Sequence, residues 1–138
     1  RMEKPLLGKT ILIVEDEAVF RSMLEGILTA LGARTMPAVN GLEAITILEK
    51  QDADLIICDL EMPQMNGGKL VEHIRMSGNT VPILIISATE NMADIAHVLR
   101  LGVQDVLLKP LKNLERFREA VFECLYPSMF TSKVEEDE

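Results

Sequence analysis

The sequence predicts an α/β protein: an open, doubly wound sheet of five parallel strands in the order 2-1-3-4-5, with five helices. Two observations lead to this fold. Short apolar runs alternate with amphipathic stretches, which is typical of parallel strands joined by helices on both faces of a sheet. The chain has 138 residues, which suits one open sheet of this kind, whereas a closed barrel of eight such units needs about 250 residues.

Five apolar segments are predicted as strands. The first, Thr10–Val14, is a nearly continuous apolar run rich in β-branched residues, as expected of a strand buried on both faces. The other four are the short apolar runs at 33–36, 54–58, 82–86 and 105–108.

Five amphipathic stretches follow these strands and are predicted as helices. In the first, apolar side chains recur at helical spacing from Ala18 to Leu31, and Gly32 ends the helix. Asn40 is predicted to cap the second, since its side-chain oxygen can accept from a free backbone N–H. This second helix is predicted over 41–50. The remaining three helices are predicted over 67–76, 91–101 and 114–125.

The domain boundaries follow from where this alternation starts and stops. We expect an N-terminal tail over 1–8 and one compact domain over 9–126. Residues 127–138 are expected to start a helix that links this domain to a C-terminal effector domain. Ser132 and Glu135 have the spacing of a capping box, which supports a helix start there.

Composition argues against several classes of function. The net charge of −8 disfavours binding to nucleic acid or to an anionic membrane surface. No run of about 18 apolar residues is present, so no membrane span is expected. Cys58 and Cys124 do not form a Cys-x-x-Cys pair, so we expect two core thiols in a reducing cytoplasm rather than a zinc site.

Polar side chains follow four of the predicted strands at the edge where open parallel sheets bind ligands. Glu15 and Asp16 follow the first strand and Asp59 follows the third. Ser87 follows the fourth strand and Lys109 the fifth. Because these strands are neighbours in the predicted order, we expect the five side chains to converge.

The converging residue types suit phosphoryl transfer. Crowded carboxylates repel one another, and Mg²⁺, which prefers carboxylates, waters and phosphate oxygens, would relieve that repulsion. Asp59 is then a candidate nucleophile, since aspartate can form an aspartyl phosphate. Mg²⁺, the Lys109 ammonium and the Ser87 hydroxyl could each contact one phosphoryl oxygen.

The segments that contain these residues resemble the motifs of receiver domains in bacterial two-component response regulators, a flavodoxin-like family. The resemblance extends over roughly residues 9–125, with every motif in order. The matching motifs are Val14-Glu15-Asp16-Glu17, Asp59-Leu60-Glu61-Met62-Pro63-Gln64-Met65-Asn66-Gly67, Ile86-Ser87-Ala88 and Lys109-Pro110.

The resemblance assigns roles to the acidic residues. It implies that Asp59 is the phosphoacceptor, supplied by a histidine kinase or a small phosphodonor. It implies a Mg²⁺ site in which Asp16 and Asp59 bind directly, Glu15 binds through water and Glu61 offers its backbone carbonyl. A receiver gains a phosphoryl group and slowly loses it, so the resemblance does not imply a stand-alone enzyme.

One position departs from the family pattern. Ser87 and Lys109 match the pair that contacts the phosphoryl group in receivers. Receivers usually have Tyr or Phe three residues before that lysine, and its ring moves inward when the serine moves. Here the residue is Val106, so rotation of an aromatic ring cannot transmit the signal.

A narrower resemblance is to the receiver of RssB-type regulators, which bind the stationary-phase sigma factor and deliver it to the ClpXP protease. Those regulators also have a C-terminal domain of PP2C phosphatase-like fold. The similar segments are residues 87–96, 99–103 and 124–130.

Three alternatives stay open from the sequence. The chain could be the receiver of a PP2C-type phosphatase regulator that acts on an anti-sigma pathway, or a pseudo-receiver that only binds a partner. It could also be a phosphatase with an aspartate nucleophile. Such phosphatases generally need a second Asp two residues later, where this chain has Glu61.

Overall fold

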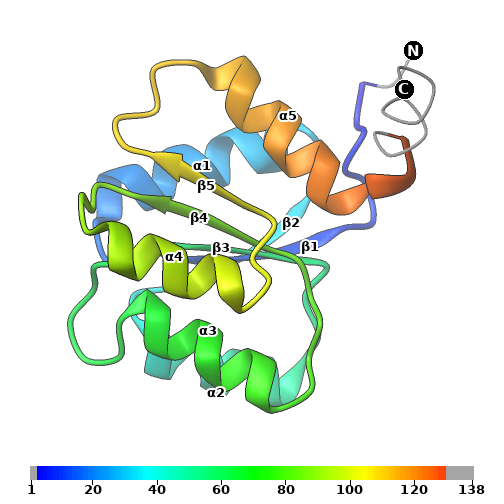
Figure 1. The fold of residues 1–138 in the computed structure, drawn as a ribbon. Helices are drawn as coiled ribbons and strands as arrows, with labels where there is room; N and C mark the ends of the chain where they lie inside the picture. The colour runs from blue at the N-terminus through cyan, green and yellow to red at the C-terminus, as the bar shows by residue number, and fades with distance from the viewer. Residues whose placement is uncertain (1–2, 130–138) are drawn as a thin grey trace.

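The computed structural model, which describes residues 3–129, has the predicted sheet (Figure 1). Its five strands are all parallel and lie in the order β2-β1-β3-β4-β5. Leu12 of β1 pairs with Met36 of β2 on one side and with Ile56 of β3 on the other. The strands are β1 (Thr10–Val14), β2 (Arg34–Ala38), β3 (Leu55–Cys58), β4 (Ile83–Ser87) and β5 (Asp105–Leu108).

Helices cover both faces of the sheet. In Figure 1, α1 and α5 lie on one face and α2, α3 and α4 lie on the other. The predicted cap of α2 is confirmed, because the Asn40 side chain accepts from the Glu43 N–H at 2.9 Å. The helices are α1 (Ala18–Ala30), α2 (Gly41–Lys50), α3 (Gly67–Met76), α4 (Met92–Arg100) and α5 (Leu114–Leu125).

Each face of the sheet has its own hydrophobic core. Side chains alternate between the faces along a strand, so Ile11 and Ile13 pack under α1 and α5, and Leu12 and Val14 pack under α2, α3 and α4. Leu6, which precedes β1, is fully buried in the first core, and its N–H donates to the Leu31 carbonyl at 2.9 Å. The segment before β1 therefore packs against the domain.

Element boundaries differ from the predicted ones mainly at β2. This strand runs from Arg34 to Ala38, rather than over 33–36, because it pairs with β1 along the full length of that strand. It includes Pro37, which an edge strand tolerates because a residue without an N–H can face outward there. The other strand and helix ends agree with the predicted ends to within one residue.

A short helical segment follows the five helices, within the range 127–138 where the sequence predicts that a helix starts. Residues 127–129 are helical and follow α5 after a break at Tyr126. The predicted capping pair, Ser132 and Glu135, and the acidic run over 135–138 lie outside the described residues.

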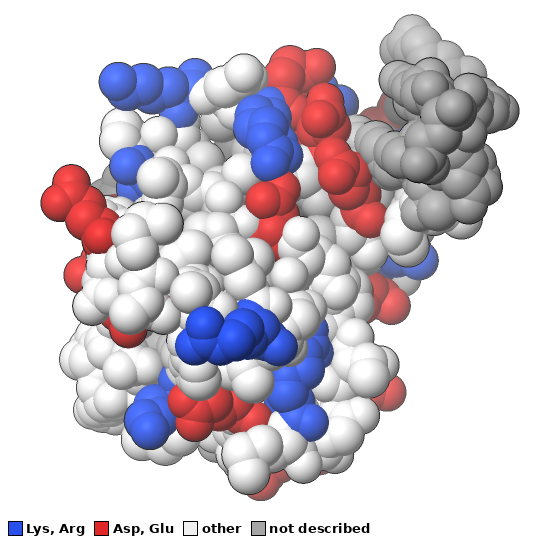
Figure 2. All heavy atoms as spheres, viewed as in Figure 1, with Lys and Arg blue, Asp and Glu red and all other residues white. Residues whose placement is uncertain are grey.

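The helices and one face of the molecule bear on membrane and nucleic-acid binding. None of the helices in residues 3–129 is long and apolar enough to cross a membrane. On the face shown in Figure 2, a basic group in the lower middle has acidic side chains next to it, and a further acidic group lies towards the top, so this face has both signs of charge.

Candidate functional site

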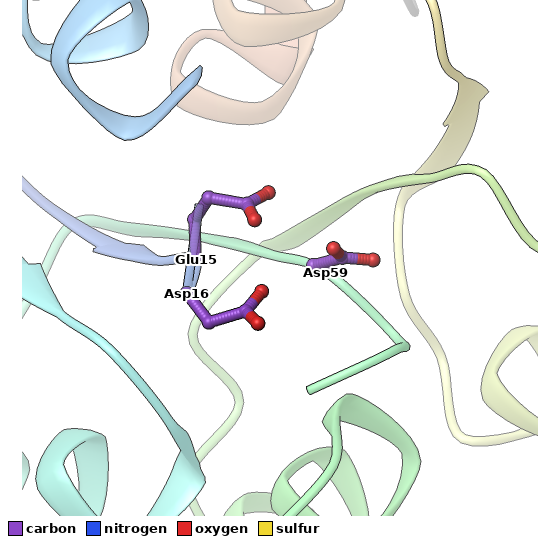
Figure 3. Close-up of side chains that lie close together, drawn as sticks. All are labelled: Glu15, Asp16 and Asp59. Carbon is purple, nitrogen blue, oxygen red and sulfur yellow. The ribbon is translucent and has the colours of Figure 1, made fainter. Parts of the chain in front are cut away.

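The predicted acidic residues meet at the carboxyl ends of β1 and β3. Figure 3 shows Glu15 and Asp16 leaving the end of β1 and turning towards the side where Asp59 lies. One carboxylate oxygen from each of the three lies within 4.8 Å of the others. The two strand ends are held together by the Asp59 N–H, which donates to the Val14 carbonyl at 3.1 Å.

Glu15 and Asp16 are adjacent but have different environments. Glu15 is only 2% exposed, and both of its carboxylate oxygens are bonded: Oε2 accepts from the Glu17 N–H at 3.0 Å and Oε1 accepts from Lys109 at 2.9 Å. Burial raises the pKa of Glu15, although these two hydrogen bonds act in the opposite direction. Asp16 is exposed, so its carboxylate is open to an ion from solvent.

Lys109 links the ends of β1, β3 and β5. Its ammonium lies 2.9 Å from Glu15 Oε1 and 3.1 Å from Asp59 Oδ2, and its side chain is 18% exposed. Burial alone would lower the pKa of Lys109, but the hydrogen bonds and charges of Glu15 and Asp59 outweigh it and the pKa is raised. The Lys109 ammonium also lies 4.4 Å from the centre of the Phe20 ring.

Ser87 is the last residue of β4 and is fully buried. Its hydroxyl oxygen accepts from the Thr89 N–H at 3.3 Å. Thr89 is buried too, and its own hydroxyl accepts from the Asn91 N–H at 3.1 Å. The structure therefore brings Ser87 to the predicted edge of the sheet but bonds it to the loop that leads into α4.

The loop after Asp59 is fixed by close backbone contacts. The Glu61 N–H donates to Asp59 Oδ1 at 3.1 Å. A side chain at Gly67 would place its Cβ 2.1 Å from the Asp59 carbonyl oxygen, so α3 can start this close to the strand only with glycine at this position. The orientation of Asp59 thus depends on the first turn of α3.

Val106 lies in β5 opposite Ile85 of β4. It is half-buried and packs against the core under α2, α3 and α4. The position where receivers usually have an aromatic ring is therefore occupied by a short aliphatic side chain.

Sequence reasoning did not single out Phe20 or Thr89. Each gave a usable signal in the sequence. Phe20 is one of only five aromatic residues in the chain and lies in the first turn of the helix after the acidic pair. Thr89 adds a second hydroxyl two residues after Ser87. Their contacts with the site depend on how α1 and the β4–α4 loop pack, which periodicity does not reveal.

Comparison with known proteins identifies a similar regulator. The chain is 62% identical, over 99% of its length, to the protein named Regulator of RpoS from Escherichia coli (strain K12). It spans only 41% of that relative. This similarity confirms the predicted resemblance to the RssB-type regulator.

Two solved structures have the same fold. A response regulator receiver protein from Pseudomonas putida superposes with a TM-score of 0.79 and 32% identity, covering 83% of this chain and 96% of that one. The receiver domain of a sensor histidine kinase from Pseudomonas aeruginosa gives a TM-score of 0.74 and 32% identity, with coverage of 86% and 98%. That structure is described as having a magnesium ion coordinated in its active-site cleft.

The family assignment follows from the extent of the match. The model of the response regulator receiver domain matches residues 11–122, which include every strand except the first residue of β1. The fold, the order of the motifs and the relatives all agree with this match. The chain belongs to the response regulator receiver domain family.

Proposed function

We propose that this domain accepts a phosphoryl group on Asp59 in a Mg²⁺-dependent reaction and thereby switches the regulator of which it is a part. The observation that supports this most directly is the position of the Asp59 carboxylate. It is 6% exposed, lies 3.1 Å from the Lys109 ammonium and shares an acidic cluster with Glu15 and Asp16.

The donor set fits a hard divalent cation. Three carboxylates share one ammonium within the described site, so the cluster retains an excess of negative charge. Mg²⁺ prefers such oxygen ligands together with waters. Asp16, Asp59 and the Glu61 carbonyl would hold it directly, and Glu15 would hold it through water. When bound, the ion supplies positive charge to a phosphoryl oxygen.

The other residues then have separate tasks in the transfer. A carboxylate oxygen of Asp59 attacks the phosphorus of the donor, the new P–O bond forms, and the bond from phosphorus to the donor group breaks. Lys109 moves its hydrogen bond from Asp59 to a phosphoryl oxygen. Ser87 uses its hydroxyl oxygen to accept from Thr89, so the hydroxyl proton is available for another phosphoryl oxygen.

The partners proposed for the domain follow from its relatives. A histidine kinase or a small phosphodonor would supply the phosphoryl group. Since the similar E. coli protein is named a regulator of RpoS, we extend the proposal to a cytoplasmic adaptor whose effector domain controls delivery of the stationary-phase sigma factor to ClpXP. In this role the receiver acts as a switch rather than as a stand-alone enzyme.

Intact-mass measurement tests the phosphotransfer. After incubation with acetyl phosphate and Mg²⁺, the wild-type chain should gain one phosphoryl group, and a chelator should prevent this. Asp59→Ala should gain none, and Asp16→Ala should react more slowly. Asp94→Ala, which removes an exposed acid on α4, is the matched control and should react normally.

Other outcomes would contradict the proposal. Full phosphorylation of the Asp59→Ala variant at a different carboxylate would show that Asp59 is not the acceptor. Steady release of inorganic phosphate without a labelled protein would indicate a phosphatase, and neither labelling nor release would indicate a pseudo-receiver.

A further inference from the structure

The Lys109 ammonium has three partners, and one of them is not a carboxylate. Glu15 and Asp59 bond it at 2.9 and 3.1 Å, and the Phe20 ring lies beside it with its centre 4.4 Å away. A lysine ammonium within about 6 Å of an aromatic ring centre is attracted by the ring. Phe20 is therefore a third partner of the ammonium.

The position of the Phe20 ring is set by packing against the core and by the attachment of its helical turn to β1. Phe20 lies in the first turn of α1 and packs against the core under α1 and α5. The next residue, Arg21, donates to the Glu15 carbonyl at 2.7 Å, which ties this turn to the end of β1. Phe20, Met23 and Leu111 line an apolar hollow next to Lys109. The ammonium is therefore partly shielded from water, and a cation shielded in this way is attracted to a ring more strongly than an exposed one.

The two kinds of partner respond differently to phosphorylation. A carboxylate oxygen of Asp59 that becomes bonded to phosphorus loses much of its charge, and Glu15 contributes to the cation cluster, so both hold the ammonium less strongly. A neutral ring binds neither Mg²⁺ nor phosphate oxygen. The contact between Phe20 and Lys109 is the one that can persist while the lysine changes partners.

We propose that Phe20 is a positioning residue for phosphotransfer: its ring keeps the Lys109 ammonium directed at the site as the lysine passes from carboxylate to phosphoryl oxygen. This rests on the proposed function of Asp59 and adds to it a residue on α1. The ring acts only through Lys109 and does not touch the phosphoryl group.

The test measures binding of beryllofluoride, a phosphoryl mimic, to the whole chain at saturating Mg²⁺ by calorimetry. Phe20→Leu should weaken beryllofluoride binding on the order of 3- to 30-fold, the range expected for loss of a cation–ring contact. Phe20→Tyr keeps the ring and should bind like the wild type. Met23→Leu, in the same hollow on the same helix, is the matched control and should also bind like the wild type.

A double-mutant cycle separates positioning from general damage to the fold. In a Lys109→Met background, Phe20→Leu should have no further effect, since the ring then has no ammonium to hold. Binding of Mg²⁺ alone should change by less than about twofold, because Phe20 supplies no ligand to the acidic cluster. Phe20→Met provides a second ring-free variant if the leucine variant does not fold.

Three results would overturn the inference. Unchanged beryllofluoride binding by a folded Phe20→Leu or Phe20→Met variant would show that the ring is not needed. An equal loss in the Lys109→Met background, or in Met23→Leu, would show that the effect is structural. If the wild type binds beryllofluoride normally in these experiments, the proposed function survives; if it does not bind at all, both proposals fall.

Discussion

The proposed phosphoacceptor site and the α4–β5 face both include residues at the carboxyl ends of strands, but they differ in construction. The site buries a charged set supplied by separate strand ends, with Glu15 and Asp59 almost fully covered. The α4–β5 face, formed by Met92, Leu99 and Leu108, has exposed apolar side chains instead. The charges of Glu15, Asp59 and Lys109 have specific partners inside the domain, whereas the apolar side chains of the α4–β5 face are open to solvent.

The connection between the two regions is a series of hydrogen bonds. Ser87 accepts from Thr89, and Thr89 accepts from Asn91. The Asn91 side chain in turn accepts from the N–H groups of Ala93 and Asp94, which lie in the first turn of α4. A movement of Ser87 towards a phosphoryl group would therefore reach the start of α4 without an aromatic ring.

The largest expected effect is at the close contact behind Asp59. Gly67→Ala would bring Cβ to 2.1 Å from the Asp59 carbonyl oxygen, so we expect it to lower the free energy of unfolding by about 3 kcal/mol and to slow phosphorylation. Gly68→Ala is the control, because its Cβ meets nothing closer than 3.5 Å, and it should change stability by less than about 1 kcal/mol. Urea unfolding of both variants measures the difference, and equal losses would contradict this reading of the site.

The next effect separates the exposed acid from its neighbours. At a free Mg²⁺ concentration ten times the dissociation constant, binding should stabilise the wild-type chain by about 1.4 kcal/mol. The Asp16→Asn variant should lose most of this stabilisation, because the exposed Asp16 carboxylate of the wild type is the one open to an ion. Glu17→Gln, whose side chain lies outside the acidic cluster, should retain it. Thermal unfolding with and without Mg²⁺ provides the measurement, and full stabilisation of Asp16→Asn would argue against this metal site.

The smallest expected effect concerns the connection to α4. Thr89→Val removes the acceptor of the Asn91 N–H and should lower stability by about 1 kcal/mol. Asp59 of the Thr89→Val variant should still be phosphorylated, but the change in the α4 amide signals on phosphorylation should be smaller. Thr89→Ser, which keeps a hydroxyl, should show the full change in these signals. Val106→Ala is the comparison and should leave the α4 response intact. Amide spectra that respond equally in Thr89→Val and wild type would exclude this route.

The sequence predicts the site better than it predicts the contacts around it. Asp59, Ser87 and Lys109 could be placed because the ends of parallel strands share one edge of the sheet, so position in the chain determines position in the fold. The length of β2 could not be predicted, since pairing with β1 sets it. Leu6 was expected in a tail but lies in the core, because a single apolar residue has no periodicity to reveal its burial.

Contacts between side chains and loops account for the remaining differences. The ring of Phe20 reaches Lys109 because α1 packs against the loop after β5, and Thr89 reaches Asn91 because of the turn that follows β4. Both arrangements depend on the geometry of loops, whereas hydrophobic patterns predict only which faces of helices and strands are buried.

The most direct test of the account is a residue-by-residue comparison of amide signals between the free chain and the chain loaded with Mg²⁺ and beryllofluoride. We expect the largest changes beyond the acidic cluster in the segment 87–94 and along α4, with small changes at Val106. Largest changes at Val106, with the segment 87–94 unmoved, would contradict the claim that the β4–α4 loop transmits the state of Asp59.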